Sequence, residues 1–145
     1  TKLTGITDEM LIDGVSQQKA MLDLARFIGD SIVVAQYAPF DLWFIEKHFT
    51  VANFYDTRTM AYALDLPSAK LAGIVEHYGF EQEEAHRALS DAHDCRKVFF
   101  EMVEAFANDG LSAGSLMNVV GTKPERMPKK YPNNTLMIID YGEED

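Results

Sequence analysis

Between Ile32 and Asp41 the chain reads Ile-Val-Val-Ala-Gln-Tyr-Ala-Pro-Phe-Asp, and this stretch decides the fold. The apolar, β-branched run Ile32–Ala35 is typical of a buried parallel strand. Pro39 suits the first turn of the helix that follows. In open α/β sheets ligands bind beyond the carboxyl ends of the strands, so Asp41 is well placed to hold one. Taken alone, an Asp at this position is more often a residue that only caps or decorates the helix start.

Helices and short strands alternate on both sides of this stretch. The first helix is expected to begin after Thr7 and to end at Gly29, and a second to follow Pro39. Further helices are expected after Thr57 as the N-cap, over 71–78 and over 88–106. Strands are expected over 32–35 and 51–55. The aromatic residues Phe40, Trp43 and Phe44 are expected to pack along the helix after Pro39. This alternation predicts an α/β domain. Two or three strands are too few for a good open sheet, so either strands are missing or another chain supplies them.

The C-terminal part of the chain has a different character. We expect an α/β domain over residues 1–110 and an extension over 111–145. Residues 121–134 are rich in Pro and basic residues and predict a loop. A strand is expected over 135–140, and it is followed by an acidic end.

Composition excludes several classes of protein. The 145 residues are 47% apolar and 25% charged, which are ordinary globular values. Net charge is 13 − 23 = −10, so the surface repels a long phosphate backbone, although bound cations would still let an enzyme grip a few nucleotides. No apolar run approaches the roughly 20 residues that span a bilayer, so no membrane partner is expected. The single cysteine, Cys95, suggests a reducing compartment, most simply the cytoplasm.

A second local pattern places an imidazole five residues before a carboxylate. It runs from His86 to Asp91 as His-Arg-Ala-Leu-Ser-Asp, at the entry to the predicted helix over 88–106. An Asp in a first helical turn is often only a capping residue, and a His in a loop is more often solvated than catalytic. Alone, this pattern is also more often structural.

Together the two patterns are much more specific. His86-x-Ala-x-x-Asp91, preceded by Val-Ala-x-x-Ala-x-Phe-Asp41, resembles the second and third motifs of the DEDDh 3′–5′ exonucleases. That family includes the proofreading subunits and domains of bacterial replicative polymerases, and ribonuclease T. The resemblance extends over residues 1–106, through Leu3–Thr7, Tyr55-Asp56-Thr57, and Leu71 with Gly79.

The resemblance implies a ribonuclease-H-like fold and a two-metal site for Mg²⁺ or Mn²⁺. Asp41 and Asp91 would be metal ligands, and His86 would take the proton from the attacking water. Phe40 and Trp43 could stack a terminal base, with core packing as the structural alternative. The implied activity is 3′–5′ removal of nucleotides from single-stranded or frayed ends, DNA before RNA. A DNA polymerase or a second protomer would be a further partner.

The family's first motif, Asp-x-Glu on an opening strand, is absent, and so are the first strands of its sheet. Two carboxylates alone are expected to bind metal weakly and to hydrolyse slowly, if at all. Three explanations stay open. The sequence is a fragment truncated at the N-terminal strands, or a catalytically inactive binding or scaffold module. In the third, the tail supplies the missing ligands from Asp140 and Glu143, after an apolar strand.

Overall fold

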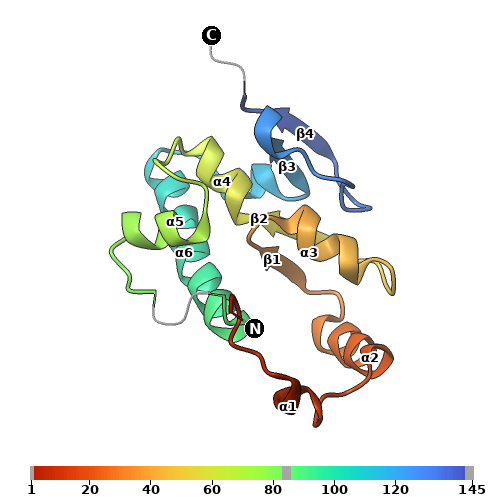
Figure 1. The fold of residues 1–145 in the computed structure, drawn as a ribbon. Helices are drawn as coiled ribbons and strands as arrows, with labels where there is room; N and C mark the ends of the chain where they lie inside the picture. The colour runs from red at the N-terminus through yellow and green to blue at the C-terminus, as the bar shows by residue number, and fades with distance from the viewer. Residues whose placement is uncertain (1, 83–85, 143–145) are drawn as a thin grey trace.

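The structure is a computed structural model that describes residues 2–82 and 86–142 (Figure 1). Its helices and strands are, in chain order, α1 (Asp8–Leu11), α2 (Gln17–Ile28), β1 (Ile32–Ala35), α3 (Ala38–Ile45), β2 (Asn53–Asp56), α4 (Thr57–Ala63), α5 (Leu71–His77), α6 (Ala88–Asn108), β3 (Val119–Thr122) and β4 (Met137–Asp140), with short 3₁₀ turns at Ala113–Leu116 and Pro124–Arg126. The expected mixed α/β class is confirmed. No helix formed by the described residues combines the length and the apolar character that crossing a bilayer requires.

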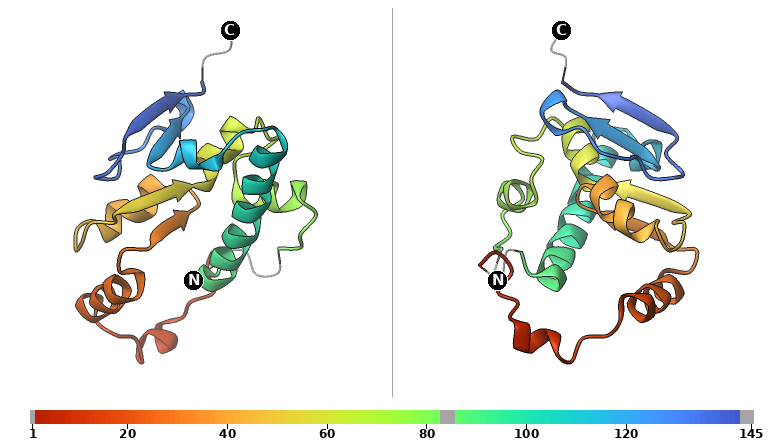
Figure 2. Two further views of the ribbon diagram at one scale, coloured as in Figure 1. Left: turned by 180° about the vertical axis from the view of Figure 1, so that it is seen from behind. Right: turned by 45° about the vertical axis from the view of Figure 1, so that its right-hand side comes forward.

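The strands form two short parallel sheets of two strands each. In the first, β1 pairs with β2, which confirms the parallel strand expected at 32–35. In the second, β3 pairs with β4. Asn118 links the two sheets, because its side-chain oxygen accepts a hydrogen bond from the Phe54 amide at 2.8 Å and its own amide donates to the Phe54 carbonyl at 2.9 Å. Figure 2 shows the two sheets from behind, with α6 running beside them.

One strand was not expected from the sequence. β3 begins with only two apolar residues and continues into the predicted loop over 121–134. All four of its residues are nevertheless buried. The amide of Gly121 donates to the Thr59 side chain at 2.8 Å, and Val120 packs with Leu42 and Phe54. Contacts with distant residues therefore fix this strand, and a local pattern does not contain them. The division at residue 110 stays a prediction, although β3 packs on α4.

The long helix α6 supplies much of the core. Its inward residues Cys95, Val98, Met102 and Phe106 are buried, as their helical spacing indicates. They pack with buried residues of α4 and α5, among them Met60, Ile74 and Val75. α6 thus forms a rigid support behind the first sheet.

Two expectations about burial are wrong. β1 is not a buried strand, since Ile32 is 49% exposed and its other residues are half-buried. On α3, the side chains of Phe40 and Phe44 are exposed, and Ala38 and Leu42 face the core in their place. The reason is the same for both. Among the described residues only β2 pairs with β1, and nothing covers the outer face of α3.

The carboxylate of Asp56 joins the ends of both strands in the first sheet. Its Oδ1 accepts hydrogen bonds from the amides of Tyr37 (2.9 Å), Ala38 (3.3 Å) and Arg58 (3.1 Å). Its Oδ2 accepts one from the Thr59 hydroxyl at 2.8 Å. The side chain is 1% exposed, and burial raises the pKa of this carboxyl.

Asp56 is also the N-cap of α4, because its side chain accepts from the Arg58 amide. The expectation that Thr57 caps this helix is therefore wrong. Thr57 is the first helical residue, and its hydroxyl donates to the Gln36 side chain at 2.6 Å. Sequence alone favours either residue as a cap, and the buried partners of Asp56 decide between them.

Replacement of Asp56 tests this arrangement. Asp56→Ala should lower the free energy of unfolding by about 3–5 kcal/mol, because it leaves three buried amides and a hydroxyl without their acceptor. Asp56→Asn keeps one acceptor oxygen and should cost clearly less. Urea denaturation of both variants measures the difference, with Asp30→Asn on the surface as the control. Equal losses for the Ala and Asn variants would contradict this role.

Candidate active site

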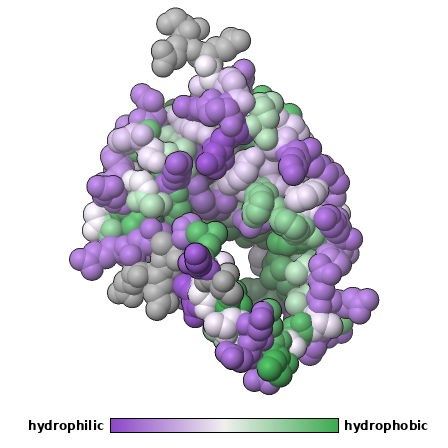
Figure 3. Space-filling view, in the orientation of Figure 1, coloured by the Kyte–Doolittle hydropathy of each residue, from purple (hydrophilic) through white to green (hydrophobic). Residues whose placement is uncertain are grey.

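An open groove of about 1560 Å³ lies along the uncovered side of β1. Its walls come from α2, β1, α3 and the beginning of α6, and Asp41, His86 and Asp91 all line it. Figure 3 shows an opening in this region, between the N-terminal helices and the rest of the molecule, with hydrophobic side chains around it. The three residues that the two sequence motifs singled out therefore share one groove.

Asp41 lies in the first turn of α3. The turn before it contains Tyr37 in the left-handed conformation (φ 62°), which the bond to Asp56 holds in place. Asp41 is exposed at the groove, and neighbouring groups bury part of its carboxylate. This burial raises the pKa of Asp41 to about 6, and the negative charge of Asp56 adds to the rise. A carboxyl group of this kind gains from a bound cation.

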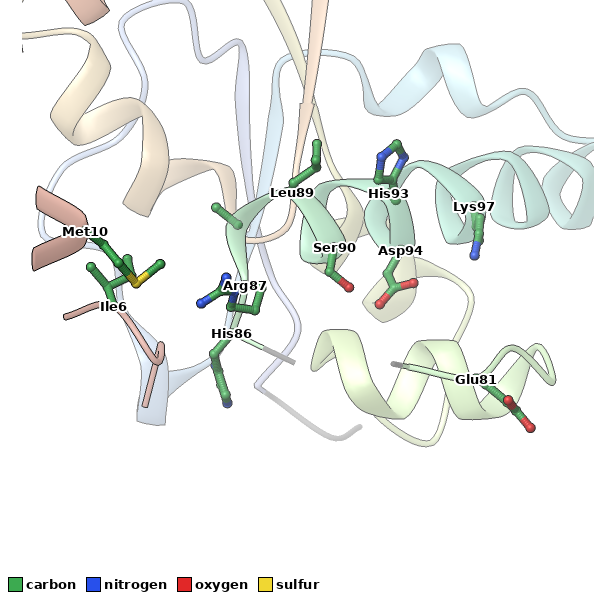
Figure 4. Close-up of a pocket in the computed structure, with 11 residues that line it drawn as sticks. Ile6, Met10, Glu81, His86, Arg87, Leu89, Ser90, His93, Asp94 and Lys97 are labelled. Atoms are coloured by element: carbon green, nitrogen blue, oxygen red, sulfur yellow. The ribbon is translucent and has the colours of Figure 1, made fainter. Parts of the chain in front are cut away.

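Asp91 lies in the first turn of α6 and is connected to His86. Its Oδ1 accepts a hydrogen bond from the His86 amide at 3.3 Å. His86 adopts a left-handed backbone conformation (φ 66°), which is strained for a residue other than Gly. Figure 4 shows its side chain projecting away from α6. Asp91 thus has the structural role of a helix-entry acceptor, and its second oxygen has no such bond among the described residues.

The carboxylates fit a hard divalent cation in type but not in number. Carboxylate oxygens are the ligands that Mg²⁺ and Mn²⁺ prefer. Within residues 2–82 and 86–142, no group of three or more His, Cys, Asp or Glu side chains is arranged to hold a metal ion. Asp41 and Asp91 can therefore provide part of a metal site, and further ligands would have to come from elsewhere.

The two aromatic candidates lie outside the groove. Neither Phe40 nor Trp43 lines it, and Phe40 is 56% exposed on the outer face of α3. The Trp43 ring lies 4.4 Å from Lys47 Nζ and 5.6 Å from Lys129 Nζ, measured to the ring centroid. Their proposed stacking on a terminal base stays a prediction.

The two tail candidates are also separate from the groove. Asp140 ends β4, and its Oδ1 accepts a hydrogen bond from the Gly142 amide at 2.8 Å. It does not line the groove. Glu143 lies outside the described residues. Their roles as extra ligands stay predictions.

The sequence motifs did not identify several polar residues that line the groove as Asp41 does. Arg58, Arg126 and Tyr37 line the same groove. Gln36 also lines it, and its side chain bridges the Thr57 hydroxyl (2.6 Å) and the Ala69 carbonyl (2.7 Å). The one available signal for Arg58 was its position two residues after the strand-ending Asp56.

The chain is similar to known proteins over most of its length. A family model described as "Exonuclease" (RNase T) matches residues 1–99. The chain is 26% identical over 150 residues to the DNA polymerase III PolC-type of Staphylococcus epidermidis, covering 97% of this chain and 10% of that protein. It is 25% identical over 146 residues to the protein of the same name from Staphylococcus aureus, covering 94% of this chain and 10% of the relative. The chain spans about a tenth of the length of these relatives.

The raised pKa of Asp41 predicts a pH-dependent stability. Because the pKa is about 6 in the folded chain and 3.8 in its ordinary state, the charged form destabilises the fold above pH 6. Asp41→Asn should therefore raise Tm by about 1–3 °C at pH 7.5, and the gain should disappear as the pH falls to about 4. Thermal unfolding across this pH range checks it, with Asp30→Asn as the control. A lower Tm at pH 7.5 would contradict it.

Proposed function

Because the chain belongs to the RNase T exonuclease family, we propose that it takes part in the metal-dependent 3′–5′ removal of nucleotides from single-stranded or frayed ends. DNA is the favoured substrate, and the similarity to PolC-type polymerases supports work beside a DNA polymerase. The observation that supports the proposal is that Asp41, His86 and Asp91 all line one groove.

Each of the three residues has a distinct task in this reaction. Bound divalent ions would supply the nucleophilic water and stabilise the leaving oxygen. Asp41 and Asp91, each in the first turn of a helix, would hold those ions at the groove. His86 is exposed and its amide contacts Asp91, and its imidazole would take the proton of the attacking water. The groove walls orient the strand end.

The remaining ligands require another segment. Among the described residues β1 has one free edge, which runs along the groove beside Asp41. We place the missing carboxylates on a strand that pairs with this edge, as in a ribonuclease-H-like sheet. The strand would belong either to the same polypeptide or to a partner. A carboxylate there would lie across the groove from Asp41, and a cation held between the two would offset the burial and the Asp56 charge that raise the pKa of Asp41.

The alternative function is a catalytically inactive module that keeps the exonuclease-like shape for binding. The specific observation in its favour is that the described residues form no group of three metal-ligating side chains. The two functions make opposite predictions for hydrolysis, so one assay separates them.

The direct test is degradation of a 5′-labelled single strand with Mg²⁺ or Mn²⁺. We expect a ladder of products shortened from the 3′ end, abolished by EDTA. His86→Ala should slow it by about 10²-fold or more, since a general base contributes this much. Asp91→Asn should also abolish it, because a metal ligand is lost.

His93→Ala provides the matched control, since His93 is an exposed histidine two residues beyond Asp91 on α6 and does not line the groove. Shortening that persists in both the His86 and Asp91 variants would reject the assigned roles. Absence of shortening with either cation would favour the inactive module or a site whose remaining ligands lie on another segment.

A metal-binding test separates the groove from the tail. Mn²⁺ should raise Tm, and Asp41→Asn or Asp91→Asn should remove that increase. Asp140→Asn should leave it unchanged, because Asp140 does not line the groove. The variant Glu143→Gln extends the test to the other tail residue. Loss of the Mn²⁺ effect in a tail variant alone would show that the tail completes the site.

A further inference from the structure

Arg58 is a nearly buried cation without an acidic partner among the described residues. Its side chain is 8% exposed. Its Nε donates to the Tyr62 hydroxyl at 2.8 Å, and its guanidinium carbon lies 4.5 Å from the centroid of the Tyr37 ring. Within residues 2–82 and 86–142 the one ion pair joins Lys19 to Asp23, on α2. Among the described residues the contacts of its guanidinium are thus with aromatic rings and a hydroxyl group, and the nearby carboxylate of Asp56 contacts the backbone amide of Arg58.

This arrangement is costly unless it has a use. An arginine is almost never buried without a partner, because the charge loses its hydration. The two tyrosine rings hold the planar group in one orientation, with centroids 4.5 Å (Tyr37) and 5.6 Å (Tyr62) away. A guanidinium fixed in this way is prepared for a planar, bidentate contact with an anion such as phosphate.

Other positive charges lie beside Arg58. Arg126, at the end of a 3₁₀ turn, is exposed and lines the same groove. Burial raises the pKa of Tyr37, and the charges of Arg58 and Arg126 both oppose that rise, so both lie near this ring. Lys123 Nζ lies 5.0 Å from the centroid of the Tyr62 ring. Arg58, Arg126 and Lys123 thus lie near the Tyr37 and Tyr62 rings, in a chain whose net charge is −10.

We propose that Arg58 and Arg126 bind a backbone phosphate of the single-stranded substrate next to Asp41. The inference rests on the proposed function, since it assumes that the groove receives a nucleic acid. Arg58 and Arg126 line the same groove as Asp41, so a strand that lies in this groove with its end at Asp41 can reach their guanidinium groups. The contact gives an acidic protein a local attraction for a phosphate, and it fixes which part of the strand reaches the carboxylates.

Binding of an oligonucleotide tests the site without hydrolysis. The probe is a 5′-fluorescein-labelled deoxythymidine decamer, measured by anisotropy with EDTA present at several salt concentrations. Arg58→Gln and Arg126→Gln should each weaken binding by about threefold to tenfold and lower the salt slope by about 0.7, the value for one phosphate contact on a single strand. The control is Arg26→Gln on α2, because Arg26 does not line the groove. Affinities and slopes equal to the control would overturn the proposal.

Two further variants guard against misfolding and against confusion with the catalytic roles. If Arg58→Gln does not fold, Arg58→Lys and Arg126→Gln take its place in the binding test. Arg58→Lys keeps the positive charge but loses the planar guanidinium, so it should also weaken binding. Asp41→Asn and Asp91→Asn should keep binding in EDTA while losing any metal-dependent shortening. If the oligonucleotide is shortened normally and the arginine variants bind it as tightly as the control does, the phosphate site is rejected and the exonuclease function is not. If binding depends on the two arginines but no shortening occurs, the exonuclease function is rejected and the phosphate site is not.

Discussion

The four hydrogen bonds that the buried carboxylate of Asp56 accepts are the contact on which the site geometry depends. They connect the turn after β1 to the turn after β2, so the start of α3 and the start of α4 cannot move independently. Asp41 lies on the first of these helices and Arg58 on the second. One buried charge therefore positions both a candidate metal ligand and a candidate phosphate ligand, and it also disfavours ionisation of Asp41.

The turns that precede α3 and α6 have a backbone feature in common. Tyr37 and His86 both adopt left-handed backbone conformations, and each precedes a helix with a carboxylate in its first turn. Strain of this kind persists only where the surroundings enforce it, and here carboxylates enforce it, through Asp56 for Tyr37 and Asp91 for His86. Two similar turns thus precede helices whose first-turn acidic residues both line the groove.

Local patterns revealed what depends on neighbours along the chain, and missed what depends on distant contacts. The strand at 32–35, the helix start at Pro39 and the inward face of α6 follow from periodicity and propensity. The strand at Val119–Thr122 is fixed by Thr59 and Leu42, far away in sequence, so no local rule detects it. Likewise the environment of Arg58 includes the Tyr37 ring, which is distant in the sequence, besides Tyr62 one turn further along α4, and the sequence alone shows only an ordinary basic residue.

Cys95 offers an internal probe of the groove. The thiol lines the groove floor at 7% exposure, beside the Thr57 hydroxyl, and burial raises its pKa to about 11. The thiolate is the reactive form of a cysteine, and the raised pKa keeps Cys95 mostly as the thiol. Alkylating reagents should therefore react slowly with it while α6 stays packed in place. Any segment or strand end that settles into the groove would shield this sulfur further, and any opening of α6 would expose it. The rate at which Cys95 is alkylated would therefore report whether the groove is occupied.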